Sequence, residues 1–158
     1  MRPVALVRIL IDGYSLLHEW RNLAPGSSRF SAAAREALIA ILTQYADALT
    51  TPLTLFFDGS GAPPGTPKAH SSPKLEIIFS PAGRTADDLI ERVAYRLREY
   101  GEVLVVTDDL VERDTVTGFG GLSQNCAAFI AEVESVLGDF NRDLARINRR
   151  ERDRFRRG

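Results

Sequence analysis

The sequence predicts an α/β fold with a mainly parallel sheet of about four to five strands and a long C-terminal helix. Short apolar runs alternate with longer segments of helical periodicity, which is the pattern of βαβ units. The apolar runs are bulky and mostly β-branched, as in strands buried on both faces. At 158 residues and 44% hydrophobic content, the chain is expected to form one domain with a substantial core.

Four strands are expected, and each ends close to a polar residue. The first two are followed by Asp-Gly, in which glycine permits backbone angles that other residues resist. The expected strands are Leu6–Ile11, Leu53–Phe57, Leu75–Phe79 and Val103–Val106.

Helices are expected where apolar residues recur at three- and four-residue spacing. One covers 31–49 and is rich in alanine. A second opens at Thr85, whose hydroxyl can cap it, and ends at Gly101. The last begins at about Ser123, after a glycine-rich turn, and continues to the basic end of the chain.

Two segments are predicted as loops, because Gly, Pro and Ser interrupt any periodicity. They are 14–28 and 60–73. Lys68 and His70 in the second loop, with Lys74 beside it, could contact RNA, but an ordinary exposed loop explains them better.

Charge is unevenly distributed along the chain. The net charge is −1, yet residues 141–158 carry eight Arg against three acids, which leaves +5 on this tail and −6 on the rest. We therefore divide the chain into a domain, 1–140, and a basic helical tail, 141–158. The tail either binds phosphate groups or is a solvated, frayed helix. Its candidate RNA-binding residues are Arg142, Arg146, Arg149 and Arg150.

Several classes of protein are disfavoured. A single cysteine, Cys126, excludes an internal disulfide framework and fits a reducing compartment. No apolar run approaches the length of a membrane span, and the N-terminus lacks a signal-peptide pattern. A cytoplasmic protein without membrane contact is expected. Phosphate-loop, dinucleotide-binding and nucleophile-elbow motifs are absent, while His18 and His70 are expected at the surface or in packing.

The acids point to a metal site. Parallel strands end at one sheet edge, where ligands bind in open α/β folds, so Asp12, Asp58 and Asp109 should meet there. The helix after the third strand adds Asp87 and Asp88. Each acid alone has an ordinary explanation as a turn or cap residue. Together they repel one another unless a cation neutralises them, and hard oxygen ligands favour Mg²⁺ or Mn²⁺. With the basic tail, this indicates phosphodiester hydrolysis.

The order of these motifs resembles the YacP-like NYN domain family of the PIN-like nuclease superfamily. The resemblance extends from about Leu6 to Glu134 and also includes the glycine-rich turn before the last helix. It is carried by Ile11-Asp12-Gly13-Tyr14, Phe57-Asp58-Gly59, Ile78-Phe79-Ser80, Thr85-Ala86-Asp87-Asp88-Leu89-Ile90-Glu91 and Val106-Thr107-Asp108-Asp109.

The resemblance implies a three-layer α/β/α PIN-like domain and a metal-dependent endoribonuclease. Its substrate would be RNA, mRNA in particular, and the ribosome a partner, as for a bacterial member of the family. By position, Asp12, Asp87 and Asp109 would hold Mg²⁺ or Mn²⁺, with Asp58 as an additional acid. A metal-activated water would attack the phosphodiester bond.

Three positions depart from the family pattern. Ser15 replaces an Asn, Asp108 replaces a small hydroxyl residue, and Asn125 replaces a Ser. Asp88, Asp108 and Ser15 are expected to orient water or phosphate.

Two other functions stay open. Because Ser15 departs from the family pattern, one alternative is a catalytically silent RNA- or ribosome-binding module of the same fold. The other is a metal-dependent phosphatase of small phosphate esters, which the acids also suit. Three aromatic residues expected near the acidic edge can stack on unpaired bases or pack in the core: Tyr14, Trp20 and Phe119.

Overall fold

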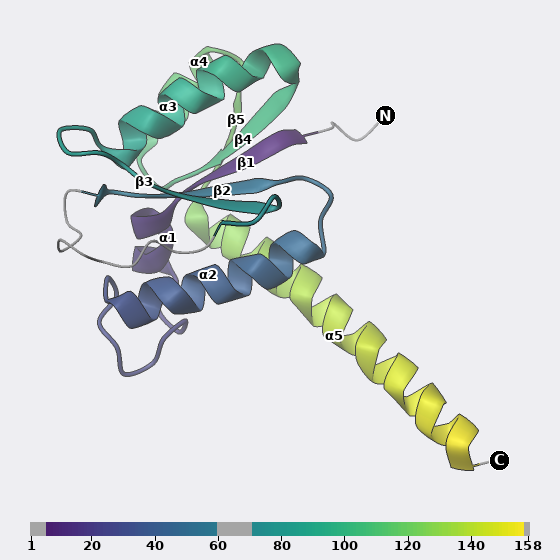
Figure 1. Ribbon diagram of the computed structural model, residues 1–158. Coiled ribbons are helices and arrows are strands. Elements are labelled where there is room, and N and C mark those ends of the chain that lie inside the picture. Colours follow the sequence, from purple (N-terminus) through teal and green to yellow (C-terminus); the bar gives the residue numbers. More distant parts are fainter. Residues whose placement is uncertain (1–5, 60–70, 157–158) are drawn as a thin grey trace.

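A computed structural model describes residues 6–59 and 71–156 (Figure 1). Lys68, His70 and most of the predicted 60–73 loop lie outside the described residues. Five parallel strands form one sheet in the order β3-β2-β1-β4-β5. The strands are β1 (Leu6–Asp12), β2 (Leu53–Phe57), β3 (Leu75–Phe79), β4 (Glu102–Val106) and β5 (Leu122–Gln124).

Helices cover both faces of this sheet and give three layers (Figure 1). One face carries α3 (Ala86–Leu97) and α4 (Leu110–Gly118), with the short 3₁₀ helix η2 (Arg98–Tyr100) after α3. The other face carries α1 (Gly13–Glu19), α2 (Ala32–Asp47) and α5 (Cys126–Arg156). The expected three-layer α/β/α fold is confirmed.

Strand β1 lies at the centre and separates two cores. Ile9 and Ile11 point into the core beneath α1, α2 and α5, whereas Leu10 points into the core beneath α3 and α4. Because side chains alternate along a strand, Asp12 continues on the side of Leu10. Its register partner in β2 is Phe56. The last residue of β1 therefore presents a carboxylate on the α3/α4 side of the carboxyl edge.

Two predicted helix starts are confirmed by their caps. The Ser31 hydroxyl accepts a hydrogen bond from the Ala34 amide at 3.1 Å. The Thr85 hydroxyl accepts one from the Asp88 amide at 3.2 Å. Each satisfies one of the amides that a helix start leaves unpaired.

Residues 14–28 were predicted as a loop, and the first part of that prediction is wrong. Helix α1 runs from Gly13 to Glu19, and Asp12 caps it by accepting a hydrogen bond from the Ser15 amide at 3.3 Å. Leu16 and Leu17 are buried in the core. Burial of these two leucines together with the cap stabilises a helix that is too short to show a periodic pattern.

The predicted start of the last helix at Ser123 is also wrong. Residues 122–124 form β5, which pairs with β4 through Leu104–Leu122, Val105–Ser123 and Val106–Gln124. Helix α5 then starts at Cys126 and continues without interruption to Arg156. The boundary at residue 140 between a domain and a tail stays a prediction.

Among the described residues, no helix is both long and apolar enough to cross a membrane.

Candidate metal centre

Asp12 is held in one orientation by three hydrogen bonds. Its Oδ2 accepts from the Ser15 hydroxyl at 2.9 Å and from the Thr107 hydroxyl at 3.3 Å. Its Oδ1 accepts from the Ser15 amide at 3.3 Å. Asp12 is buried, and Thr107, just after β4, is fully buried. The end of β1, the first turn of α1 and the end of β4 together fix this carboxylate.

Three carboxylates meet at this point, and we call them the acidic cluster: Asp12, Asp87 and Glu112. One oxygen from each lies within 4.8 Å of the others. Asp87 comes from the first turn of α3 and Glu112 from the first turn of α4. Because α3 and α4 both begin at the carboxyl edge, their first turns bring these acids to the end of β1.

Glu112 is the most unusual member of the acidic cluster. Its side chain is only 1% exposed, and neither carboxylate oxygen has a hydrogen-bond partner among the described residues. Burial is the main reason why its pKa rises to about 9, and the neighbouring Asp87 and the charge of Asp12 raise it further. Leaving buried polar atoms unpaired costs free energy.

Asp87 titrates in the same surroundings. Burial raises its pKa to about 6, the close approach of Glu112 lowers it, and the charges of Asp12 and Asp109 raise it. Asp87 and Glu112 therefore keep protons at a pH where exposed carboxyl groups have lost them.

These donors fit a divalent cation. All three are hard carboxylate oxygens, which Mg²⁺ and Mn²⁺ accept as ligands. The two carboxylate oxygens of Glu112 have no hydrogen-bond partner in the described part of the chain, and a bound cation would take the place of such a partner. Exposed acids are common without a metal, but a buried acid without a bonding partner is rare and needs an explanation.

The structure places Asp109 next to the acidic cluster, where its charge reaches Asp87. Its Oδ1 accepts hydrogen bonds from the amides of Val111 at 3.0 Å and Glu112 at 3.3 Å, so Asp109 caps α4.

Asp88 and Asp58 lie outside the acidic cluster. Asp88 is exposed on α3. Asp58 follows β2 and accepts a hydrogen bond from the Ser80 hydroxyl at 3.3 Å, toward β3.

Asp108 and Asn125 hold the start of α5. Asp108 Oδ1 accepts from the Cys126 amide at 2.8 Å, and Asn125 Oδ1 accepts from the Ala128 amide at 2.8 Å. Burial, followed by the charge of Asp108, raises the pKa of the buried Cys126 thiol. Asp108, which follows β4, thus attaches the start of α5 to the carboxyl edge, whereas Asn125 caps the helix itself.

Glu112 was missed by sequence reasoning, although it left a signal. Asp109 and Glu112 have the spacing of a capping box, in which the later Glu turns back to the cap amide. Here the Thr107 hydroxyl accepts from the Asp109 amide at 3.2 Å. Glu112 is thereby released from the capping role and faces Asp12 and Asp87.

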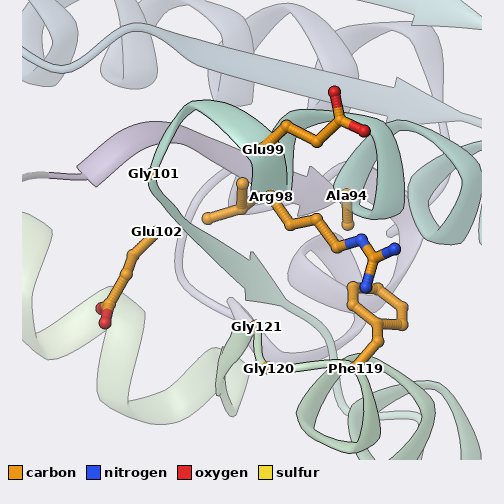
Figure 2. A pocket seen from close by; sticks show the side chains of 9 residues that line it. Ala94, Arg98, Glu99, Gly101, Glu102, Phe119, Gly120 and Gly121 are labelled. Atoms are coloured by element: carbon orange, nitrogen blue, oxygen red, sulfur yellow. The ribbon is translucent and has the colours of Figure 1, made fainter.

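Two of the three aromatic residues expected near the acids lie elsewhere. Trp20 is buried in the core beneath α2 and α5. Phe119 follows α4 and packs edge-to-face on Tyr95 with ring centroids 5.5 Å apart. It lines a cleft of about 540 Å³ beside Gly101 and Glu102, where β4 begins. Figure 2 shows Arg98 and Phe119 among the residues that line this cleft, at the sheet edge opposite the acids. The Arg98 guanidinium carbon lies 3.8 Å from the centre of the Tyr95 ring.

The fold and the site define a parallel α/β/α domain with a centre of buried and half-buried carboxylates at the carboxyl edge of its sheet. The chain matches the YacP-like NYN domain over residues 9–157 and belongs to that family.

This chain is similar in sequence and in structure to a protein of Bacillus subtilis. The chain is 26% identical to YacP of strain 168 over 140 aligned residues. These residues make up 88% of this chain and 82% of the relative. It is similar to the crystal structure of Rae1 (YacP), with a TM-score of 0.77 and 26% identity over 92% of this chain and 83% of that one. A point mutant of Rae1 gives a TM-score of 0.73 and 25% identity over 89% and 82% of the two chains.

Proposed function

We propose that this protein is a divalent-metal-dependent endoribonuclease that hydrolyses phosphodiester bonds at the acidic cluster. The observation that carries the proposal is the meeting of Asp12, Asp87 and the unpaired, buried Glu112 at the carboxyl edge. Membership of the YacP-like NYN family supports a nuclease. RNA, and mRNA in particular, is the proposed substrate, with the ribosome as the proposed partner and the cytoplasm as the proposed compartment.

The acidic cluster would hold Mg²⁺ or Mn²⁺, with Asp109 as a fourth acid in reach. A cation bound there would supply Lewis-acid activation of water and of the phosphate oxygens. The protein's own contribution is orientation, because Ser15 and Thr107 fix Asp12 through hydrogen bonds at 2.9 and 3.3 Å. Ser15, in place of the family's Asn, acts here as a support for Asp12.

Exposed arginines on α5 would add affinity for the RNA backbone. All residues from Asn141 to Arg150 are exposed, so Arg142, Arg146, Arg149 and Arg150 can reach phosphates without rearrangement of the fold. Such contacts carry no sequence information, but they offset the repulsion between an acidic body and RNA.

The test is cleavage of a labelled single-stranded RNA with Mg²⁺, with Mn²⁺ and with EDTA. We expect cleavage only with metal, and a loss of at least about 100-fold in Asp87→Asn and Glu112→Gln, because each removes a ligand charge. Asp114→Asn is the matched control, since Asp114 is an exposed acid of α4 two residues beyond Glu112. It should cleave like the unaltered protein.

Binding of Mn²⁺, followed by electron paramagnetic resonance, separates a lost ligand from a lost fold. Asp87→Asn and Glu112→Gln should bind Mn²⁺ more weakly while still unfolding in one cooperative transition. RNA cleavage that persists in EDTA would contradict the proposal. RNA binding without any metal-dependent cleavage would favour the silent binding module instead.

A further inference from the structure

A second feature of the carboxyl edge is a group of aromatic and basic side chains on α1 and before α2. We call it the aromatic platform: Tyr14, His18, Arg29 and Phe30. Phe30 is 50% exposed, and its ring meets Tyr14 edge-to-face at 5.5 Å between centroids. It lies nearly parallel to the His18 ring, at 6.5 Å and 10°. Arg29 Nη1 is 3.2 Å from His18 Nδ1.

Local structure does not account for Phe30. It precedes the Ser31 cap of α2, a position where an apolar residue often packs on the fifth residue after itself. Here that residue is Arg35, which donates a hydrogen bond to the Phe30 carbonyl oxygen at 3.2 Å. The ring faces α1 instead and leaves half of its surface in water. A half-exposed aromatic residue beside a histidine and an arginine is better explained by a ligand than by folding.

The aromatic platform is close to the acids. Tyr14 lies two residues after Asp12, and its ring packs on Phe57 at the end of β2 with centroids 5.3 Å apart. The acidic cluster occupies the α3/α4 side of the carboxyl edge, whereas the aromatic platform occupies the α1/α2 side. A chain of nucleotides that passes over the end of β1 would meet both.

We propose that the aromatic platform stacks an unpaired base of single-stranded RNA next to the phosphate cleaved at the acidic cluster. This proposal rests on the proposed function. Stacking on Phe30 needs an open base face, which a duplex does not offer, and it tolerates every base because each has a π-face. Arg29, exposed beside Phe30, can pair with a backbone phosphate. The protein would thus select unpaired RNA with little preference for base identity.

The probe is a short single-stranded oligoribonucleotide containing 2-aminopurine, whose fluorescence is quenched by stacking. Binding is measured in EDTA, so that no metal supports cleavage. We expect quenching on binding by the unaltered protein, and about tenfold weaker binding without quenching for Phe30→Ala. Phe30→Trp should restore both, whereas Phe30→Leu, which is apolar but cannot stack, should resemble Phe30→Ala.

Tyr100→Ala is the matched control, because Tyr100 is an aromatic residue 76% exposed just before β4, at the opposite edge of the sheet. It should bind and quench like the unaltered protein. A complementary strand, added to make the duplex, should abolish quenching.

The outcomes separate the two proposals. Quenching and Phe30-dependent binding without cleavage in Mg²⁺ or Mn²⁺ would overturn the nuclease and leave the aromatic platform in place. Cleavage with unchanged binding and quenching in Phe30→Ala would overturn the aromatic platform alone. If the unaltered protein binds no RNA, both fall.

Discussion

At the scale of single residues, the proton on Glu112 links the site to stability. Its pKa rises to about 9, mainly through burial, from an ordinary value of 4.5. The folded state therefore holds a proton that the unfolded state releases between these values. In this range the free energy of unfolding falls as pH rises. Asp87, with a pKa raised to about 6 from 3.8 by burial, acts in the same direction at lower pH.

We expect the melting temperature of the metal-free protein to fall steadily from about pH 5 to pH 9. Glu112→Gln, which keeps the shape without the charge, should flatten this dependence. The measurement is thermal unfolding in EDTA at several pH values, and added Mn²⁺ should restore stability at the alkaline end. A melting temperature of the unaltered protein that is independent of pH over this range would contradict the assignment.

Thr107 supports Asp12 from the end of β4. Its hydroxyl donates to Asp12 and accepts from the Asp109 amide. We expect Thr107→Val to weaken Mn²⁺ binding by about 10- to 100-fold, because the hydroxyl orients a ligand. Thr107→Ser keeps the hydroxyl and should stay near the unaltered protein. Mn²⁺ titration followed by electron paramagnetic resonance measures both, and equal affinities of the two variants would exclude this positioning role.

The sequence indicated Asp12 and Asp87 but not Glu112, for a physical reason. Residues at strand ends and helix starts can be placed by the topology of parallel sheets alone. Glu112 lies inside the first turn of α4, and its direction depends on which group bonds the Asp109 amide. That choice is made by Thr107, a contact that no local pattern reveals.

At the scale of elements, the start of α1 is packed tightly against β2. A Cβ atom on Gly13 would lie 2.5 Å from Phe57 Cε1 and 2.8 Å from the Phe56 carbonyl oxygen. Phe57 in turn supports Tyr14. The first turn of α1, the Asp12 cap and the aromatic platform therefore share one packing arrangement.

We expect Gly13→Ala to destabilise the protein by about 1–3 kcal/mol through overpacking and to lower RNA cleavage, because the Asp12 cap shifts with α1. Gly118→Ala is the control, since a Cβ at Gly118 meets nothing within 4 Å. It should be neutral or slightly stabilising. Chemical denaturation measures the free energy of unfolding of both variants. Equal values would show that the Phe57 ring moves aside without loss of stability.

Elements with a strong period were predictable, and the short ones were not. Strands β1 to β4 are apolar runs, and α2 and α3 show helical spacing. Strand β5 has three residues, two of them polar, and depends on its pairing with β4. Helix α1 has seven residues and starts with glycine, and it depends on its burial against the sheet and on the Asp12 cap.

At the scale of the whole molecule, opposite charges are segregated between the body and the end of α5. We expect the double variant Arg149→Gln and Arg150→Gln to weaken RNA binding. The slope of the logarithm of the binding constant against the logarithm of salt concentration should fall by the equivalent of up to two phosphate contacts. Cleavage of RNA that is already bound should stay unchanged.

Arg92→Gln with Arg96→Gln is the matched control, because both arginines are exposed on α3. Binding measured at 50 and 200 mM salt compares the two pairs of variants. Only the pair on the tail should reduce the salt dependence of RNA binding. If both pairs reduce the salt dependence equally, the tail has no special role.

Helix α5 has 31 residues and is therefore about 46 Å long. It begins at the carboxyl edge, where Asp108 holds the Cys126 amide, and it projects beyond the body of the domain (Figure 1). From Cys126 to Arg149 the helix rises about 35 Å, or about ten stacked nucleotides at 3.4 Å each. Under the proposed function, an RNA held at both ends would have to be at least that long. Cleavage beside the acids would leave a fragment that touches only one anchor, so hydrolysis itself would trigger product release.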